Sequence, residues 1–287
     1  MRLPVLLLLA VSIVVPAYRA DAEPADPDRP ALLEAEQAFA QGRTEQALGL
    51  VGDYLAASPQ SSRGYFLRAA IYDAGRDYAR SLPDYDRAIG LDPTRAVAYH
   101  RRGVAHFMLA KIPEALADFD RYLELKPDEK PHHWQRGIAL YYAGRYEEGA
   151  RQFELHRTVN RDDVENAAWH FACIARWKGV DAARKDLIPV TGDDRIPMAR
   201  VQEMLAGKAT PDDVLSAAAA NHPDAAALNR QLFYAHLYVG LYYEAIGRPD
   251  LAAEHLTTAA EKHPIPDYMH GVASVHVRLL KAAKKAR

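Results

Sequence analysis

The sequence predicts an all-α fold, a right-handed superhelical solenoid of antiparallel helix pairs. The first reason is that the 287-residue chain repeats itself, with similar residues recurring every 34 positions. The second is that apolar residues within each interval are spaced three or four apart, which is the spacing of one helix face. A single helix pair cannot bury its apolar face alone, so neighbouring pairs must stack. The recurring residues are Pro59, Pro93 and Pro127; Tyr85, Phe119 and Phe153; and Gly103 and Gly137.

One repeat unit, residues 62–95, shows how the pattern makes a helix pair. Each of its two helices carries a short row of apolar or small residues on one face, and Pro93 follows, where it cannot continue the helix. Small residues such as Gly137 let the two helices approach closely, and aromatic residues such as Phe153 fill the space against the next pair. We therefore expect Gly137→Leu to destabilise the array by about 1–3 kcal/mol through overpacking. The two rows are Tyr65, Ala69 and Tyr72, then Ser81, Tyr85 and Ala88.

The repeat divides the chain into an N-terminal array, an irregular segment and a return of the repeat. Residues 28–163 hold about four units, and residues 233–266 hold a fifth. Residues 164–232 break the period and read as degenerate helical hairpins, with helices expected over 164–177, 181–187 and 198–205 and another starting at Thr210. Residues 267–287 form a capping helix with an apolar stripe and a basic tail.

The first 22 residues have the features of a secretory signal peptide. Arg2 precedes an apolar run over residues 3–15, and Ala20-Asp21-Ala22 gives a small-x-small cleavage site. The run has 13 residues, whereas a membrane-spanning helix needs about 20. We expect cleavage and an exported product, periplasmic or secreted, without a stable membrane anchor. An uncleaved signal anchor is the alternative.

Composition and motifs argue for binding rather than chemistry. The net charge is −2, which speaks against nucleic acid as a partner, because phosphate binding needs a clustered positive face. The one local exception is the basic tail, which is interpreted as a solvated, fraying helix end. The sequence lacks the common signatures of hydrolases, zinc proteases, dinucleotide-binding and phosphate-binding loops, so no catalytic residue and no cofactor are predicted. The sole cysteine, Cys173, lies in an apolar run and is predicted to be a buried thiol. The twelve histidines include no pair four residues apart, so no metal site is predicted.

The partner-binding surface is expected on the first helices of the units, which line the concave side of such an array. Arginine beside tryptophan and tyrosine is the composition of an interaction hot spot. Phe107 and Tyr141 have an equally good alternative, packing against neighbouring pairs or the irregular segment. The predicted partner-binding residues are Arg63, Phe66, Asp73, His100, Arg101, Phe107, Trp134 and Tyr141.

The 34-residue period and its residue types identify the repeats as resembling tetratricopeptide repeats. The chain further resembles the NlpI type of periplasmic tetratricopeptide-repeat lipoprotein, through ENAAW at 165–169, MLAG at 204–207, and FY at 233–234 leading into GLYY at 240–243. That resemblance implies a homodimeric adaptor for cell-wall hydrolases and a periplasmic protease. The lipid-bearing cysteine of those lipoproteins has no counterpart here.

The predicted function is a non-enzymatic scaffold of the bacterial cell envelope that binds proteins or peptides in its concave groove. Two alternatives stay open. One is a solenoid that binds a small ligand such as a wall fragment, with Trp134 and Tyr141 as a stacking floor. The other is an enzyme whose site lies without a motif in residues 164–232.

Overall fold

The computed structural model describes residues 29–285, and within that range the chain is helical and forms no strand. The predicted signal peptide and the last two residues of the basic tail lie outside the described residues. The elements are α1 (Arg29–Ala40), α2 (Thr44–Ala57), α3 (Ser62–Ala74), α4 (Tyr78–Leu91), α5 (Ala96–Met108), α6 (Ile112–Leu125), the 3-10 helix η1 (Pro127–His132), α7 (Trp134–Tyr142), α8 (Tyr146–His156), α9 (Val164–Lys178), α10 (Val180–Lys185), α11 (Met198–Leu205), α12 (Pro211–Ala218), α13 (Ala225–Ala245), α14 (Pro249–Lys262) and α15 (Tyr268–Lys285).

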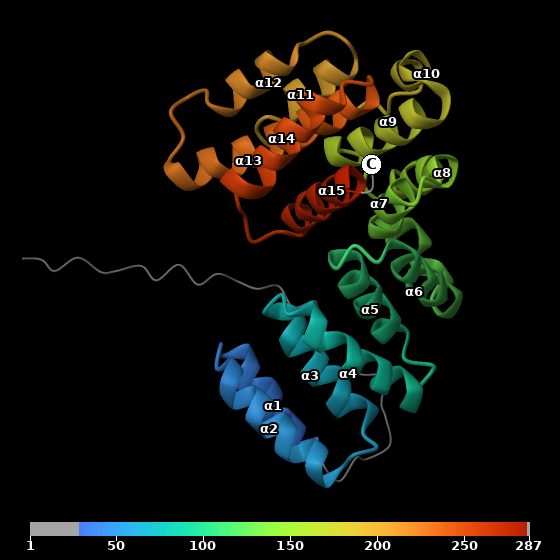
Figure 1. Ribbon diagram of the computed structural model, residues 1–287, viewed down its shortest axis with the longest axis vertical. Helices are drawn as coiled ribbons and strands as arrows, with labels where there is room; N and C mark the ends of the chain where they lie inside the picture. The colour runs from blue at the N-terminus through green and yellow to red at the C-terminus, as the bar shows by residue number, and fades with distance from the viewer. Residues whose placement is uncertain (1–28, 286–287) are drawn as a thin grey trace, which may run out of the picture.

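The first eight α-helices form four antiparallel pairs, and the pairs stack along the chain (Figure 1). Side chains at the helix starts accept backbone hydrogen bonds that the first turn leaves open. Ser61 Oγ accepts one from Gly64 N, and the Asp77 side chain accepts one from Arg80 N. The all-α solenoid predicted from the 34-residue period is confirmed.

The glycines that recur every 34 residues sit where the two helices of one pair meet. A Cβ added at Gly137 would lie 2.7 Å from Cζ of Phe153, and one at Gly103 would lie 2.7 Å from Cδ1 of Phe119. The recurring aromatic residues therefore fill the gap opposite the glycine of their own pair. They also reach the next pair as expected, since the ring of Phe119 lies 4.7 Å from that of His133 at the start of α7.

The irregular segment is helical throughout most of its length. The α9–α10 pair and α11 occupy nearly the residues expected for them, and Thr210 starts α12 with a capping box in which Asp213 returns the hydrogen bond. The first helix of the fifth unit differs, because α13 begins at Ala225, eight residues before the expected unit, where Asp224 caps it.

The C-terminal helices fold back onto the N-terminal array. In Figure 1 the last helix, α15, lies between the α13–α14 pair and helices α5 and α7. The Tyr268 ring stacks on Phe107 with centroids 6.1 Å apart, and Arg278 Nη1 donates a hydrogen bond to the Met108 carbonyl oxygen at 3.1 Å. One continuous apolar core consequently runs from Phe107 to Val277, whereas the first two pairs have small clusters of their own.

Among the helices of residues 29–285, none combines the length and the apolar character needed to cross a bilayer.

Candidate functional site

Five of the eight predicted binding residues, Arg63, Phe66, His100, Arg101 and Trp134, are partly exposed. Three of these, Arg63, Phe66 and Arg101, lie on the first helices α3 and α5, away from the aromatic group and the cavity described below. Arg63 Nη2 on α3 lies 2.8 Å from Glu36 Oε1 on α1. Phe66 packs against the ring of Tyr85, with centroids 5.9 Å apart. The Arg101 side chain on α5 keeps 41% of its surface exposed. Arg63, Phe66 and Arg101 form an accessible strip across α3 and α5, which we call the inner strip.

Asp73 lies beneath the inner strip rather than on it. Its residue surface is 9% exposed, and its Oδ2 accepts a hydrogen bond from the Tyr85 hydroxyl at 3.4 Å. Arg101 Nη1 lies 4.0 Å from the same oxygen. Burial raises the pKa of Asp73 to about 6, and the nearby Arg101 charge offsets part of that rise. Asp73 therefore orients the Arg101 side chain from the buried side of the inner strip.

His100 belongs to a packed aromatic group between α5 and the end of η1. Its Nδ1 lies 3.1 Å from Nε2 of His133, and the rings of Phe119 and Tyr122 lie within 6.0 Å of it. Burial lowers the pKa of His100 to about 4 and that of His133 to about 3. Both imidazoles are therefore neutral at pH 7.

Phe107 and Tyr141 are core residues, so the prediction that they contact a partner is corrected. Phe107 is fully buried between Tyr142 and Tyr268. Tyr141 is 4% exposed, and its hydroxyl donates a hydrogen bond to Glu244 on α13. The physical reason is that α13 and α15 cover the concave side of the array at α5 and α7.

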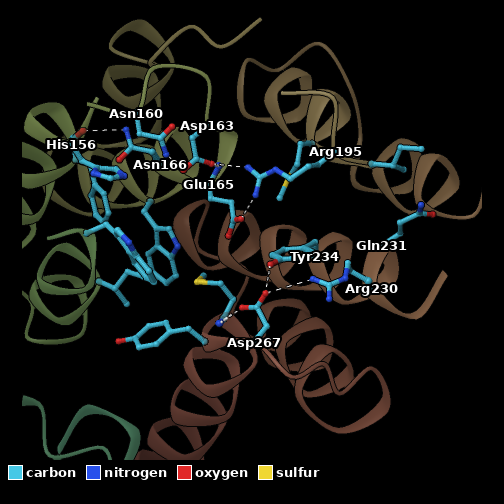
Figure 2. Close-up of a pocket in the computed structure, with 18 of the residues that line it drawn as sticks. His156, Asn160, Asp163, Glu165, Asn166, Arg195, Arg230, Gln231, Tyr234 and Asp267 are labelled. Carbon is cyan, nitrogen blue, oxygen red and sulfur yellow. Dashed lines mark hydrogen bonds and ion pairs between the residues drawn. The ribbon is translucent and has the colours of Figure 1, made fainter. Parts of the chain in front are cut away.

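Trp134, the eighth predicted residue, lines a cavity at the covered end of the concave side. The cavity has a volume of about 670 Å³ and lies between α7, α8, α9, the loop before α11, α13 and the start of α15 (Figure 2). This volume falls in the range of small-molecule sites, roughly 300–1,000 Å³. Tyr141, the other half of the predicted stacking floor, does not line it.

Much of the cavity wall is apolar and aromatic. Trp134 meets Tyr268 edge to face, with ring centroids 5.0 Å apart, so α7 and α15 together build this part of the wall. The residues of this wall, which we call the aromatic wall, are Trp134, Ile138, Phe153, Trp169, Tyr268 and Met269.

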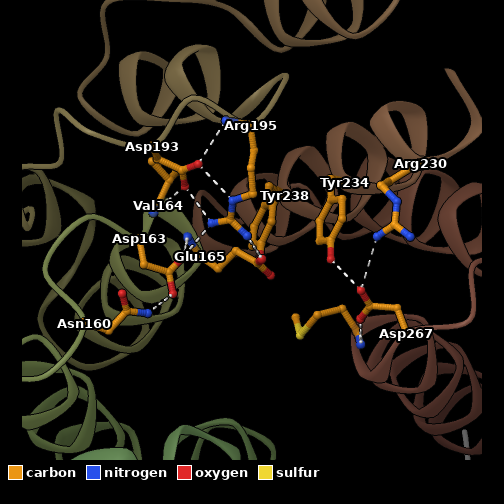
Figure 3. Close-up of polar contacts among 11 residues, drawn as sticks. Asn160, Asp163, Val164, Glu165, Asp193, Arg195, Arg230, Tyr234, Tyr238 and Asp267 are labelled. Atoms are coloured by element: carbon orange, nitrogen blue, oxygen red, sulfur yellow. Dashed lines mark hydrogen bonds and ion pairs between the residues drawn. The ribbon is translucent and has the colours of Figure 1, made fainter. Parts of the chain in front are cut away.

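A charged cluster closes one side of the cavity, where Arg195 gathers three carboxylates (Figure 3). Arg195 Nη2 lies 2.7 Å from Asp163 Oδ1 and 2.6 Å from Asp193 Oδ2, and Nη1 contacts Glu165. Asp163 also caps α9, because its Oδ1 accepts a hydrogen bond from the Glu165 backbone N–H at 3.0 Å. The cluster thus fastens the loop before α11 to the start of α9.

Glu165 is the most strongly perturbed carboxyl group of this cluster. Burial raises its pKa to about 7, although the Tyr238 hydroxyl donates to its Oε2 at 2.6 Å and Arg195 lies beside it. Only 16% of its side chain is exposed. Glu165 therefore changes charge near neutral pH at the edge of the cavity.

A second polar group, centred on Asp267, lies across the cavity (Figures 2 and 3). Its Oδ2 accepts a hydrogen bond from the Tyr234 hydroxyl at 2.8 Å, and Arg230 Nη1 lies 3.7 Å away. Asp267 Oδ1 accepts the Met269 backbone N–H at 2.7 Å. This group fastens α13 to the start of α15.

The cavity is the part of the site that sequence reasoning missed. Of the eight predicted binding residues only Trp134 lines it, and apart from Ile138, also on α7, the rest of the lining comes from residues 153–198 and 227–269. A usable signal existed at the start of α9, where Asp163, Glu165 and Asn166 place polar side chains ahead of an apolar helix. Nothing in that pattern, however, shows that α13 and α15 face it.

Cys173 is buried as predicted, with no exposed surface. Burial raises the pKa of its thiol far above the ordinary value, so the thiolate that a nucleophile needs is suppressed. Within residues 29–285 no three histidine, cysteine, aspartate or glutamate side chains are grouped so that they could hold a metal ion.

Comparison with known proteins agrees with the repeat period. Residues 32–96 and 72–130 match the family model described as tetratricopeptide repeat. The fold of this chain is an all-α tetratricopeptide-repeat solenoid. A tetratricopeptide repeat protein from Parabacteroides merdae has a similar structure, with 16% identity, a TM-score of 0.59, and coverage of 88% of this chain and 98% of that one. MamA from Desulfovibrio magneticus has 14% identity and a TM-score of 0.51, covering 56% of this chain and 91% of that one. The comparison with curated proteins found no match.

Proposed function

We propose that this tetratricopeptide-repeat chain is a non-enzymatic scaffold that binds other proteins, or peptide segments of them, along its inner strip. The observation that carries the proposal is the accessible row of Arg63, Phe66 and Arg101 on successive first helices. Arginine and aromatic side chains dominate the binding energy of many protein interfaces. Because α15 covers the array further along, the strip is where a long partner segment has room.

The charged side chains of the inner strip are held in place by their neighbours. Arg63 on α3 is paired with Glu36 on α1, and Arg101 on α5 lies beside Asp73 on α3, so each partner comes from the first helix of the preceding pair. Side chains that are already oriented lose less conformational freedom on binding. This arrangement supports a docking surface that is largely formed before the partner arrives.

The setting we propose is the bacterial cell envelope, after export and removal of residues 1–22. The sequence supports it through the apolar run and cleavage site at its start. The resemblance to NlpI-type proteins supports wall hydrolases or a protease as partners, and a homodimer as the assembly.

The test is an affinity capture from envelope extract with tagged residues 23–287, followed by direct binding of each recovered protein in purified form. The test variant is Arg63→Glu with Arg101→Glu. The control is Arg121→Glu with Arg151→Glu, which changes two exposed arginines on the second helices α6 and α8.

Partners that bind the parent and the control but lose at least tenfold in affinity for the test variant support the inner strip. Equal binding to both variants contradicts a role for the strip. A parent that binds no purified protein contradicts the scaffold function itself.

A further inference from the structure

We propose that His236 on α13 and His255 on α14 form a chelating pair for a divalent copper ion. Neither residue belongs to the inner strip or to the cavity lining. The proposal therefore stands apart from the proposed function, and either can fail without the other.

The antiparallel pairing of α13 with α14 brings the two imidazoles together (Figure 1). Nδ1 of His236 lies 3.0 Å from Nδ1 of His255, and the ring centroids are 5.0 Å apart. Among the described residues, neither imidazole has another hydrogen-bond partner. The Nε2 atoms are nevertheless absent from the buried polar atoms that lack a partner, so each of them reaches solvent. With the ring proton on Nε2, both Nδ1 lone pairs are free to bind one metal ion.

The separation of the two nitrogens suits copper. At a metal–nitrogen distance of about 2.0 Å, nitrogens 3.0 Å apart subtend an angle of about 97° at the metal. Neighbouring ligands of tetragonal Cu²⁺ subtend roughly 90°, whereas those of tetrahedral Zn²⁺ subtend roughly 109°. Copper also has the highest affinity of the divalent first-row metals for nitrogen ligands.

Neighbouring rings hold the two imidazoles in place. The ring of His263 stacks on His236, with centroids 5.6 Å apart and planes 14° from parallel. Asn229 Nδ2 donates to the Pro264 carbonyl oxygen at 2.9 Å, which leaves Asn229 Oδ1 to accept from His263 Nδ1 at 3.1 Å. Tyr243 lies against His255, with centroids 5.4 Å apart. A chelating pair that is already oriented loses less freedom when the metal binds.

The electrostatic setting keeps the nitrogens available at neutral pH. Burial lowers the pKa of His236 to about 4, and the adjacent imidazoles and Lys262 lower it further. Burial also lowers the pKa of His255, although the carboxylates of Glu254 and Asp212 oppose that shift. A metal binds only the unprotonated imidazole, so protons do not compete with copper at pH 7. The two carboxylates favour positive charge beside His255.

The pair could not be found by spacing within one helix, because its members are 19 residues apart on different helices. Within residues 29–285 the side chains do not supply a group of three ligands. Water would therefore complete the coordination of the copper ion.

The experiment titrates CuCl₂ into the full chain, purified without a histidine tag, by calorimetry. Electron paramagnetic resonance of the copper complex counts the coordinated imidazole nitrogens, and ZnCl₂ serves as the comparison metal. The test variants are His236→Ala and His255→Ala. The matched control is His132→Ala, because His132 is exposed on η1, outside the pair. Thermal melts show whether each variant folds.

We expect the parent and the control to bind one copper ion equally, with two imidazole nitrogens in the spectrum. Each test variant should bind copper at least tenfold more weakly and should lose one nitrogen. Zinc should bind the parent at least tenfold more weakly than copper. His263→Ala should weaken copper binding a few-fold and keep both nitrogens, since His263 only positions His236.

Copper binding that is unchanged in both test variants overturns the proposal, and so does a parent spectrum with fewer than two imidazole nitrogens. Zinc binding as tight as that of copper overturns the assignment to copper. If His236→Ala fails to fold, His255→Ala and the spectrum of the parent decide the question.

Discussion

At the scale of single residues, two kinds of position should affect stability most directly. One is a glycine packed against an aromatic ring, and the other is a titratable group buried away from water. Gly137 faces Phe153 so closely that even one added carbon would need the ring to move. Glu165 is held where its ionised form is disfavoured. Each has a consequence for stability that can be measured.

Gly137→Leu should lower the free energy of unfolding by about 1–3 kcal/mol, because the new side chain must displace a buried ring. Gly49→Leu is the matched control. Gly49 lies in α2 with no atom within 4 Å of an added Cβ, so leucine there should be stabilising by about 0.5–1 kcal/mol through helix propensity. Urea unfolding of both variants checks the pair. Equal midpoints would show that the packing of glycine on the ring is not tight.

Glu165→Gln should gain stability relative to the parent as pH rises from 5 to 8. The folded-state pKa of Glu165, about 7, exceeds its ordinary value of 4.5, so the folded parent holds a proton that the unfolded chain releases. The parent therefore loses stability through that pH window, and the variant does not. The difference should reach about 1–3 kcal/mol, at 1.4 kcal/mol per pKa unit.

The measurement is urea unfolding at pH 5 and pH 8, with Glu147→Gln as the control. Glu147 is half-exposed in an ion pair with Arg151 on α8, so its variant should shift by less than about 0.5 kcal/mol. A stability difference between Glu165→Gln and the parent that does not change with pH would contradict the burial argument.

At the scale of elements, the closing helix α15 has the largest structural effect. It covers Phe107 on α5 and contacts Trp134 on α7, and its first residues complete the cavity. The stripe of apolar residues predicted for residues 267–287 is buried at Val272 and Val275. The helix therefore seals the core as well as ending the array.

A chain ending at Pro266 should lose at least about 3–5 kcal/mol of stability, which is the usual cost of removing one large buried aromatic side chain. It should also bind the dye ANS, because Phe107 and its neighbours become exposed. Of the described residues, a chain ending at Leu280 lacks only 281–285, which are all exposed, and it should behave as the full chain. Calorimetry and dye fluorescence compare the three. Equal melting temperatures for all three would show that α15 is not part of the core.

The elements also show how far the sequence could be interpreted. The period of 34, Gly137 and the helix start at Thr210 are local signals, and they led to the helix pairs and to the all-α solenoid. Whether Phe107 and Tyr141 are exposed or buried depends on helices more than 100 residues further along the chain. No local pattern reports that contact, so the sequence left partner binding and core packing open for both residues, and the structure has the second. Trp134 was placed on the concave side by period alone, and it does line the cavity.

At the scale of the whole molecule, the chain combines two kinds of architecture. The first two helix pairs have small separate apolar clusters, as expected for an open repeat array. The second pair also reaches the C-terminal helices at one point, where Arg76 Nη2 donates to the Ile265 carbonyl oxygen at 3.4 Å. From α5 onward one core joins the repeats to the C-terminal helices.

Hydrogen exchange should therefore distinguish two parts of the molecule, the first two helix pairs and the core that begins at α5. Backbone amides of α1–α4 should exchange through openings that leave the rest folded, whereas amides of α7, α9 and α13 should exchange only through opening of the whole core. Mass spectrometry of peptides at increasing urea measures this order. Uniform protection from α1 to α15 would contradict two separate units.

The hydrogen bond from Arg278 to the Met108 carbonyl joins residues 170 positions apart. Repeat arrays usually fold through contacts between residues near in sequence, so they nucleate quickly. For the same reason an open array can extend elastically along its axis. Here the closing contact must form across a long loop, which costs entropy before it gains any packing. A ribosome makes residue 268 well after α5 and α7, so the core from α5 onward stays open to solvent until α15 has been made. Once formed, the same contact fixes the curvature of the array at one end. A pulling force would then have to detach α15 before the helix pairs that it covers could separate.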